Sequence, residues 1–281
     1  MQIFHDSDQL KNYLSDQRSR GKSIGFVPTM GALHQGHLAL VNKACGQNDI
    51  GLVSIFVNPT QFNNASDLQT YPREPEKDIE KLGTATPCQA VYLPEVSDIY
   101  PNGPETETIP LGNLTQNMEG SHRPGHFEGV ATVVKRFFNI IRPTRAYFGE
   151  KDFQQLAVIR HMVDQLNLPV EVIGHPTERS TEGLALSSRN QLLTDRHRKE
   201  ALVIIEQLRW IKQQVGKKSP GELKKAVQQR FSASPLQLEY AEIADPASLK
   251  PLAEWHHASH ARAFIAAHIS GVRLIDNLSL F

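Results

Sequence analysis

The sequence is poor in cysteine. Cys45 and Cys88 are the only two cysteines in 281 residues, and neither lies in a Cys-x-x-Cys pair. This number excludes a disulfide framework of the kind that stabilises small secreted proteins. We therefore expect both residues to be reduced, buried thiols that pack as small apolar side chains.

The sequence also lacks net charge. Lys and Arg together number 30, and Asp and Glu together number 30, so the formal net charge is zero. A protein that binds nucleic acid in general needs an excess of positive charge to attract phosphates. The composition therefore argues against such a protein, but it is compatible with a small anionic ligand held by a few local cations.

Long apolar runs are absent as well. No stretch reaches the roughly 18 residues that a membrane-spanning helix needs. Residues 1–20 are polar and carry charges of both signs, which is typical of neither a signal peptide nor a transit peptide. Internal repeats and low-complexity segments are also missing. From these features we expect a soluble, cytoplasmic protein.

Apolar stretches of two lengths alternate along the first two thirds of the chain, in a composition that is 40% hydrophobic and 21% charged. Brief runs rich in β-branched and aromatic residues predict strands at 23–28, 51–57, 90–94, 145–149 and 170–174. Longer stretches predict helices at 38–48, 76–82, 128–141 and 152–167. This order indicates an α/β fold: a Rossmann-like, doubly wound parallel sheet covered on both faces.

The pattern changes near residue 185. Beyond it, the predicted elements are helices at 194–215 and 221–231 and antiparallel strands at 236–245, 261–269 and 272–280. Thr194 is a candidate N-cap for the first of these helices. We therefore expect two domains: an α/β domain over residues 1–185 that binds nucleotide and substrate, and a smaller α+β domain over residues 186–281.

The stretch "VPTMGALHQGHLAL", residues 27–40, joins a predicted strand to a predicted helix. In a doubly wound sheet, ligands bind at such strand ends, and a helix N-terminus attracts phosphate. Gly31 and Gly36 have the G-x-x-x-x-G spacing of a P-loop, but His37-Leu38 replaces its Lys-Ser/Thr. The sequence contains no G-x-G-x-x-G motif either, so it lacks both common phosphate-binding fingerprints.

His34 and His37 supply a different chemistry at this position. Two imidazoles beside a helix end can donate hydrogen bonds to a phosphate on which charge builds during displacement. The motif alone leaves two other readings open. The histidines can be ordinary surface side chains, or their i, i+3 spacing can bind zinc, although the local sequence offers no third ligand.

Several blocks of the sequence together resemble one protein family. "LHQGH" is similar to the His-x-Gly-His signature of nucleotidylyltransferases and class I aminoacyl-tRNA synthetases. The blocks that resemble the pantoate–β-alanine ligases are "VPTMGALHQGH" (27–37), "SIFVNPTQF" (54–62), "YPR" (71–73), "RPGHFEGV" (123–130), "FGEKDFQQL" (148–156), "GLALSSRN" (183–190) and "RLIDN" (273–277). These blocks run in order across nearly the whole chain, which makes the resemblance specific.

The resemblance implies an ATP-dependent ligase that condenses pantoate with β-alanine through a pantoyl-adenylate and releases AMP and pyrophosphate. It further implies a homodimer that uses Mg²⁺ with ATP and has no tightly bound organic cofactor. By the same resemblance, the ATP-binding residues are Met30, Gly31, Ala32, Leu33, His34, Gln35, Gly36, His37, Gly149, Glu150, Lys151, Asp152, Glu178, Leu186, Ser187, Ser188 and Arg189. Of these, His34, His37, Lys151 and Arg189 are expected to act in catalysis.

The resemblance also implies that Gln61 and Gln155 bind pantoate and that Gln61 contacts β-alanine. Neutral amides suit the pantoate hydroxyls, whereas a cation on the attacking carboxylate would stabilise its ground state. Asp78 is the candidate for the magnesium neighbourhood. Two positions depart from the family pattern: Glu178 stands where an apolar residue is usual, and Lys77 stands where an acidic residue is common.

Single motifs also have plainer readings. Lys151 and Asp152 can be ordinary charges at a helix start, and "SSRN" alone is typical of a turn. Two other functions stay open: a nucleotidylyltransferase acting on another small acid or phosphate, and a nucleotide-binding module without turnover. A tRNA ligase is disfavoured because the chain is short and neutral and lacks a basic RNA-binding appendage.

Overall fold

The computed structural model describes residues 1–62, 65–255 and 260–281. These residues form two compact units. The first unit comprises 1–112, 122–150 and 155–176, and the second comprises 113–121, 151–154 and 177–281. The sequence placed the change of pattern near residue 185, whereas the units change at 176. The second unit also takes in two short segments that come from within the α/β part of the sequence.

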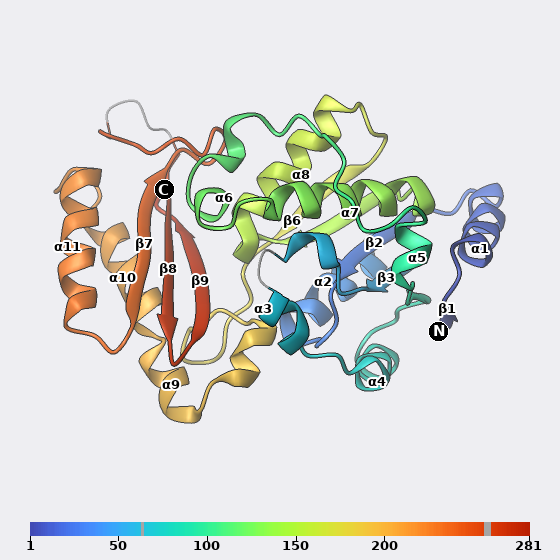
Figure 1. Ribbon diagram of the computed structural model, residues 1–281, viewed down its shortest axis with the longest axis horizontal. Helices are drawn as coiled ribbons and strands as arrows, with labels where there is room; N and C mark the ends of the chain where they lie inside the picture. Colours follow the sequence, from blue (N-terminus) through green and yellow to red (C-terminus); the bar gives the residue numbers. More distant parts are fainter. Residues whose placement is uncertain (63–64, 256–259) are drawn as a thin grey trace. The chain divides into compact units, whose positions relative to one another are not determined.

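Six parallel strands form the sheet of the first unit (Figure 1). They are β1 (Gln2–Phe4), β2 (Ile24–Thr29), β3 (Ile50–Ile55), β4 (Ala90–Tyr92), β5 (Arg145–Gly149) and β6 (Glu171–His175), in the order β1-β4-β3-β2-β5-β6. Every neighbouring pair is parallel. The doubly wound parallel sheet is therefore confirmed, and β1 is a strand that the sequence analysis did not predict.

Helices cover both faces of this sheet. The helices of this part of the chain are α1 (Ser7–Ser19), α2 (Gln35–Gln47), α3 (Ala65–Thr70), α4 (Pro75–Ala85), α5 (Val96–Ile99), α7 (His126–Ile141) and α8 (Phe153–Gln165). Consecutive residues of β2 show the two faces, because side chains alternate along a strand. The Phe26 ring lies 5.6 Å from that of Phe137 on α7, whereas Val27 shares a buried cluster with Leu38 and Val41 of α2.

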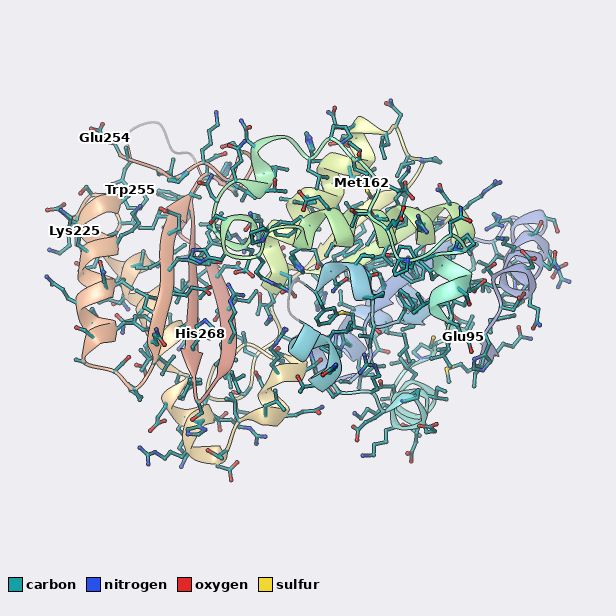
Figure 2. All side chains as sticks on the ribbon, in the orientation of Figure 1. Glu95, Met162, Lys225, Glu254, Trp255 and His268 are labelled. Carbon is teal, nitrogen blue, oxygen red and sulfur yellow. The ribbon has the colours of Figure 1, made fainter. Side chains whose placement is uncertain are left out.

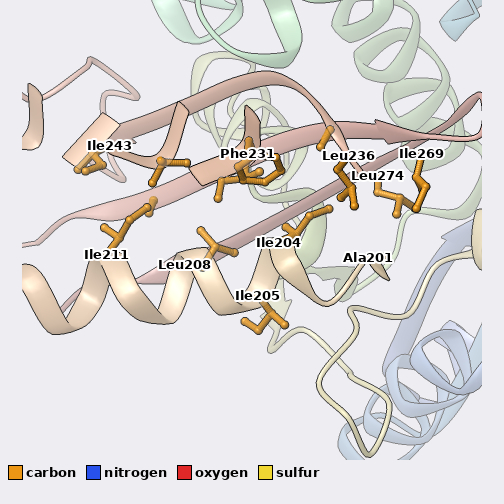
Figure 3. Packing of buried hydrophobic residues seen from close by; sticks show 14 of the residues in the cluster. Ala201, Ile204, Ile205, Leu208, Ile211, Phe231, Leu236, Ile243, Ile269 and Leu274 are labelled. Atoms are coloured by element: carbon orange, nitrogen blue, oxygen red, sulfur yellow. The ribbon is translucent and has the colours of Figure 1, made fainter. Parts of the chain in front are cut away.

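The second unit contains an antiparallel sheet in the order β7-β8-β9. Its elements are α6 (Glu119–His122), whose last residue belongs to the first unit, η4 (Ser188–Leu192), α9 (Asp195–Glu200), α10 (Val203–Gln214), α11 (Pro220–Ser232), β7 (Gln237–Ala244), β8 (Arg262–Ile269) and β9 (Val272–Ser279). In the core of the unit, Ile204, Leu208 and Ile211 of α10 lie toward sheet residues such as Ile269 and Leu274 (Figure 3). The predicted antiparallel strands and the helix at 221–231 are confirmed.

One predicted helix is interrupted. The sequence predicted a single helix over 194–215, but the structure ends α9 at Glu200 and begins α10 at Val203. The sequence has no proline or glycine at this break, and its helical hydrophobic period continues across it. The sequence pattern therefore gave no sign of the interruption. The N-cap is confirmed, since the Thr194 side chain accepts a hydrogen bond from the His197 N–H.

Both cysteines are free thiols in the first unit. Cys88 is buried, as expected, whereas Cys45 is only half-buried. Burial raises the pKa of Cys45 to about 11 and that of Cys88 to about 12. Both thiols therefore stay protonated at neutral pH and are poor nucleophiles. Among the described residues, no helix is both long and apolar enough to span a bilayer.

Candidate functional site

Two of the segments predicted to bind nucleotide, which begin at Met30 and at Gly149, lie at the ends of the neighbouring strands β2 and β5. From the central strand β2, the chain proceeds to β3 and β4 on one side and to β5 and β6 on the other. The sheet order therefore reverses between β2 and β5, and in doubly wound sheets ligands bind beyond the carboxyl ends of such strands. Residues 30–37 follow β2, and Glu150 follows β5, which ends at Gly149.

The loop after β2 has a tightly determined backbone. Gly31 and Ala32 both have positive φ angles, 81° and 49°. Asp78 of α4 holds this loop, because its two carboxylate oxygens accept hydrogen bonds from the Ala32 N–H at 2.8 Å and the Leu33 N–H at 2.7 Å. A Cβ on Gly31 would lie 3.0 Å from Asp78 Oδ2. Glycine therefore permits both the backbone conformation and the close approach of the carboxylate.

The structure shows what Asp78 contacts, whereas its place in the magnesium neighbourhood stays a prediction. Its side chain is 1% exposed, and both of its oxygens accept backbone N–H groups. Burial raises the pKa of this carboxyl, although the two backbone hydrogen bonds oppose the shift. A direct magnesium ligand needs an accessible oxygen, so the burial of Asp78 argues against direct coordination and for a role in shaping the loop after β2.

Hydrogen bonds fix the protonated nitrogen of His34 and His37. His34 is the N-cap of α2, and its Nδ1 accepts a hydrogen bond from the Gly36 N–H at 3.1 Å. The Nδ1 of His37 accepts one from the His34 N–H at 3.3 Å. An imidazole that accepts at Nδ1 carries its proton at Nε2 when neutral. The two rings, with centroids 4.0 Å apart, are therefore a pair of Nε2–H donors at one helix end.

The same geometry disfavours the zinc reading. A histidine that ligates a metal through one ring nitrogen normally donates a hydrogen bond from the other. Both rings here accept at Nδ1 instead, which leaves the proton on the nitrogen that would have to bind the metal. Within the described ranges, no group of three or more His, Cys, Asp and Glu side chains could hold a metal ion.

Gln61 lies in η1 (Pro59–Gln61), within a buried polar network of the first unit. Its Nε2 donates to Met30 Sδ at 2.8 Å, and its Oε1 accepts from Asn58 Nδ2 at 3.2 Å. These contacts bring Gln61 to Met30, the first residue of the loop after β2, as expected if both serve one site. The amide keeps a second hydrogen atom and a second lone pair for other partners.

The backbone of Gln61 is held as firmly as its side chain. Its carbonyl lies 2.9 Å from His126 Nδ1, and Arg123 Nη1 lies 3.1 Å from His126 Nε2. Because arginine can only donate, Nε2 is the acceptor and Nδ1–H donates to the Gln61 carbonyl. Asn58 Nδ2 also reaches the Gly129 carbonyl at 3.1 Å. The sequence analysis did not assign roles to Asn58 or His126, although "NPTQF" and "RPGHF" contain them.

Gln155 is half-buried on α8 and belongs to the first unit. The sequence analysis predicted a helix over 152–167, and α8 begins at Phe153, so Lys151 lies in the preceding turn η3 (Glu150–Asp152). The two residues also belong to different units. The assignment of Gln155 to pantoate rests on the family resemblance.

Lys151 and Asp152 belong to the second unit. Lys151 Nζ lies 3.4 Å from Asp152 Oδ1, and the Lys151 carbonyl accepts a hydrogen bond from Asn277 Nδ2 at 2.8 Å. The Lys151 side chain is 17% exposed, so it is not a freely solvated charge of the kind expected at an ordinary helix start. Its backbone is tied to β9, a contact across 126 positions of the sequence.

The other predicted nucleotide residues of the second unit lie on a turn that precedes α9. The Leu186 N–H donates to the Glu178 carbonyl at 2.9 Å, which closes the turn. Ser187 is the N-cap of η4, and its Oγ accepts from the Arg189 N–H at 3.3 Å. Glu178 and Arg189 are half-buried, and Ser188 is buried. The segment "SSRN" can therefore form a turn and also contribute to a binding site, because the turn holds the backbone of Arg189.

Three comparisons with known proteins agree. A family model described as pantoate-beta-alanine ligase matches residues 2–279. The pantothenate synthetase of Porphyromonas gingivalis is 46% identical over 279 residues, which cover 99% of each chain. The pantothenate synthetase of Flavobacterium psychrophilum is 45% identical over 281 residues, which cover 100% of each chain.

Solved structures extend the likeness to the fold. A pantothenate synthetase from Thermus thermophilus matches 100% of both chains with a TM-score of 0.92 and 42% identity. A pantoate-beta-alanine ligase from Francisella tularensis, complexed with beta-gamma ATP and beta-alanine, matches 100% of this chain and 98% of its own, with a TM-score of 0.79 and 35% identity.

Proposed function

Because the chain belongs to the pantoate–β-alanine ligase family, its reaction is the ATP-dependent condensation of pantoate with β-alanine, and we propose that this runs through a pantoyl-adenylate. In the first step, a pantoate carboxylate oxygen attacks the α-phosphorus of ATP and pyrophosphate leaves. In the second step, the amine of β-alanine attacks the acyl carbon, an amide forms, and AMP leaves.

The histidine pair carries this proposal. Attack on the α-phosphorus adds negative charge to its oxygens, and donors that are already in place stabilise that charge most. The Nε2–H groups of His34 and His37 are such donors, because their tautomers are set before substrate binds. The positive end of the α2 dipole favours the same phosphate. Residues 30–37 then form the phosphate-binding loop, in which Asp78 fixes the backbone.

Cations serve the leaving group in this scheme. We assign Lys151 and Arg189 to the triphosphate, where pyrophosphate gains charge as it departs. The remaining ATP contacts are assigned, from the family resemblance, to Gly149, Glu150, Asp152, Glu178, Leu186, Ser187 and Ser188. For Glu178, the proposed contact with ATP is made by the backbone. A backbone contact suits a position where the side chain departs from the family pattern.

Pantoate is assigned to Gln61 and Gln155, and Gln61 is also assigned to β-alanine. The remaining hydrogen-bonding capacity of Gln61 supports this role, since the amide can both donate to and accept from the pantoate hydroxyls. Neither glutamine places a positive charge on the attacking carboxylate, so its nucleophilicity is preserved.

Magnesium enters this scheme with ATP. Mg²⁺ is usually bound through substrate phosphates and few carboxylates, so the lack of an acidic cluster among the described residues fits a metal carried by the triphosphate. When bound there, the ion neutralises phosphate charge.

We also propose, from the family resemblance, that the enzyme is a cytoplasmic homodimer. Light scattering of the purified protein measures its oligomeric state, and a monomer would contradict that part of the proposal.

Product analysis tests the proposed function directly. The purified protein is incubated with ATP, MgCl₂, pantoate and β-alanine, and the products are measured by chromatography and mass spectrometry. We expect AMP and pantothenate in equal amounts, and neither product without pantoate. ADP in place of AMP, or adenylation of a different acid or phosphate, would contradict the proposal. ATP binding without turnover would favour a regulatory module.

A further inference from the structure

Strand β9 carries two adjacent buried polar residues to which the proposed chemistry gives no role. Asp276 is 5% exposed and Asn277 is 3% exposed. Asp276 pairs with Ile265 and Asn277 with Phe264 on the neighbouring strand. Because successive side chains of a strand point to opposite faces, these two residues serve different sides of the small sheet. The contacts described below join residues of the second unit.

On one face, Asn277 holds the turn that contains Lys151. Its Nδ2 donates to the Lys151 carbonyl at 2.8 Å, and its Oδ1 accepts from Arg262 Nη1. The Arg262 guanidinium lies over the Phe153 ring, 4.0 Å from its centroid. The Lys151 backbone thus contacts this buried amide, and the Phe153 ring contacts its arginine partner.

A second set of contacts on this face holds the same turn. Arg273 donates from Nη1 and Nη2 to the two carboxylate oxygens of Glu119, both at 2.7 Å. The Glu119 N–H in turn donates to Gln154 Oε1 at 3.0 Å. Arg273 pairs in register with His268, which lies on β8 (Figure 2). The segment from Lys151 to Gln154 is therefore tied to β9 at both of its ends.

On the opposite face, Asp276 holds the turn that leads to Arg189. Its two oxygens accept from Arg179 Nη1 at 2.6 Å and Nη2 at 2.9 Å. Arg179 Nη1 also donates to the Gly183 carbonyl at 3.1 Å, and Arg179 forms a backbone bridge with Ala185. The ion pair is nearly buried, so removing one partner would leave an uncompensated charge.

We propose that Asp276 and Asn277 are positioning residues that fix, from opposite faces of one strand, the two segments carrying the phosphate-binding cations. Asn277 acts through Lys151, and Asp276 acts through the turn that precedes Arg189. This inference rests on the proposed roles of Lys151 and Arg189. Its physical basis is that electrostatic stabilisation of a transition state requires charges held in place before the reaction, and long side chains are placed only as well as their backbone.

The first test is a double-mutant cycle between Asn277 and Lys151. Asn277→Leu removes the donor to the Lys151 carbonyl at similar volume, and we expect it to lower kcat for AMP formation by about tenfold or more. Asn277→Asp keeps the acceptor for Arg262 and removes the same donor, so it gives a second, less disruptive variant. If Asn277 acts through Lys151, neither substitution lowers kcat further in the Lys151→Ala background, because coupled residues are not additive.

Gln207→Leu is the matched control. Gln207 is a buried amide on α10 of the same unit, and its Oε1 accepts from Arg230 Nε at 2.5 Å. We expect its unfolding midpoint to fall about as far as that of Asn277→Leu, while its kcat and both KM values stay within about twofold of wild type, because it lies outside the proposed machinery. An equal loss of kcat in Gln207→Leu would indicate a general structural effect and would overturn the inference.

A parallel cycle pairs Asp276→Asn with Arg189→Ala, and calorimetry with a non-hydrolysable ATP analogue provides a readout without turnover. We expect Asp276→Asn to weaken analogue binding and to lose its effect on kcat in the Arg189→Ala background.

Wild-type kcat in Lys151→Ala would overturn the assigned role of Lys151. Two results would overturn the positioning inference alone, provided that Lys151→Ala lowers kcat. One is wild-type kcat in both Asn277 variants, and the other is additive losses of kcat when an Asn277 substitution is combined with Lys151→Ala.

Discussion

The direction of a single hydrogen bond decides what the imidazole of His37 can do. Its Nδ1 accepts the N–H of His34, so the neutral ring presents a proton at Nε2. A ring of the opposite tautomer would present a lone pair, which repels phosphate oxygens and attracts metal ions. The capping arrangement of α2 therefore favours a hydrogen-bond donor over a metal ligand at Nε2, as the proposed phosphate contact requires.

Lys151 is the residue whose charge the proposed mechanism needs most. Lys151→Ala removes one preorganised cation, and we expect kcat to fall by about 10²–10³ with the fold unchanged. Steady-state kinetics and circular dichroism measure the two effects. Lys11→Ala is the control, because Lys11 is exposed and its ammonium contacts Ser7 and Asp8 of its own helix. Wild-type turnover in Lys151→Ala would reduce Lys151 to an ordinary charge beside a helix start.

Asp78 allows its two candidate roles to be separated. Asp78→Asn replaces one acceptor oxygen by an amide group that faces a backbone N–H of the nucleotide loop. A buried donor left without its acceptor costs about 1–3 kcal/mol, so we expect a lower unfolding free energy, a higher KM for ATP and a lower kcat. The magnesium concentration for half-maximal activity should stay unchanged. A marked rise in that concentration would restore Asp78 as a metal ligand.

Among the elements, the packing of α7 against η1 depends on one glycine. A Cβ on Gly129 would lie 2.3 Å from the Thr60 carbonyl oxygen and 2.7 Å from the Gln61 nitrogen. Gly129→Ala must therefore displace η1, and we expect it to cost about 1–3 kcal/mol of unfolding free energy and to raise KM for pantoate. In Gly46→Ala, on α2, the new Cβ meets no atom within 4 Å. This control should gain about 0.5–1 kcal/mol.

Helix α8 supports a second prediction at this scale. Gln155→Ala should raise KM for pantoate far more than KM for ATP, because a neutral amide serves the acid and not the triphosphate. Gln165→Ala, near the exposed end of the same helix, is the matched control and should leave both KM values unchanged. Equal changes of the two KM values in Gln155→Ala would remove Gln155 from the pantoate site.

The elements also show which features could be predicted from the sequence. Buried strands and amphipathic helices were recognised because their hydrophobic periods are local. The strand β1 buries only the last of its three residues and so forms no apolar run, whereas β4, of the same length, is buried throughout and was predicted. The break between α9 and α10 has no glycine or proline to mark it. Contacts such as Asn277 to Lys151 join residues 126 positions apart, and no single-sequence pattern encodes them.

At the scale of the whole molecule, the zero net charge and the proposed chemistry are consistent. Both cations assigned to the triphosphate, Lys151 and Arg189, are held by backbone contacts rather than gathered in a basic surface. Phosphate chemistry of this kind requires a few placed charges and no general excess. The family likeness extends over residues 2–279 and therefore includes the sequence of both units.

The reaction intermediate gives the last prediction, which concerns the enzyme as a whole. If the carboxylate attacks the α-phosphorus, pantoate, ATP and magnesium suffice for the first step, and β-alanine is not required. The attacking oxygen then stays on phosphorus when the amine displaces AMP. Pantoate labelled with heavy oxygen in its carboxylate should therefore pass one labelled oxygen to AMP, which mass spectrometry detects.

An acyl phosphate route makes the opposite prediction. Attack on the γ-phosphorus would release ADP, and the label would appear in inorganic phosphate. The motif at residues 33–37 favours the adenylate, because it lacks the lysine with which a P-loop binds the β- and γ-phosphates. A control with labelled water separates transfer from pantoate and hydrolysis of ATP by solvent. Unlabelled AMP from labelled pantoate would contradict the adenylate mechanism, because no other bond in the scheme carries that oxygen to phosphorus.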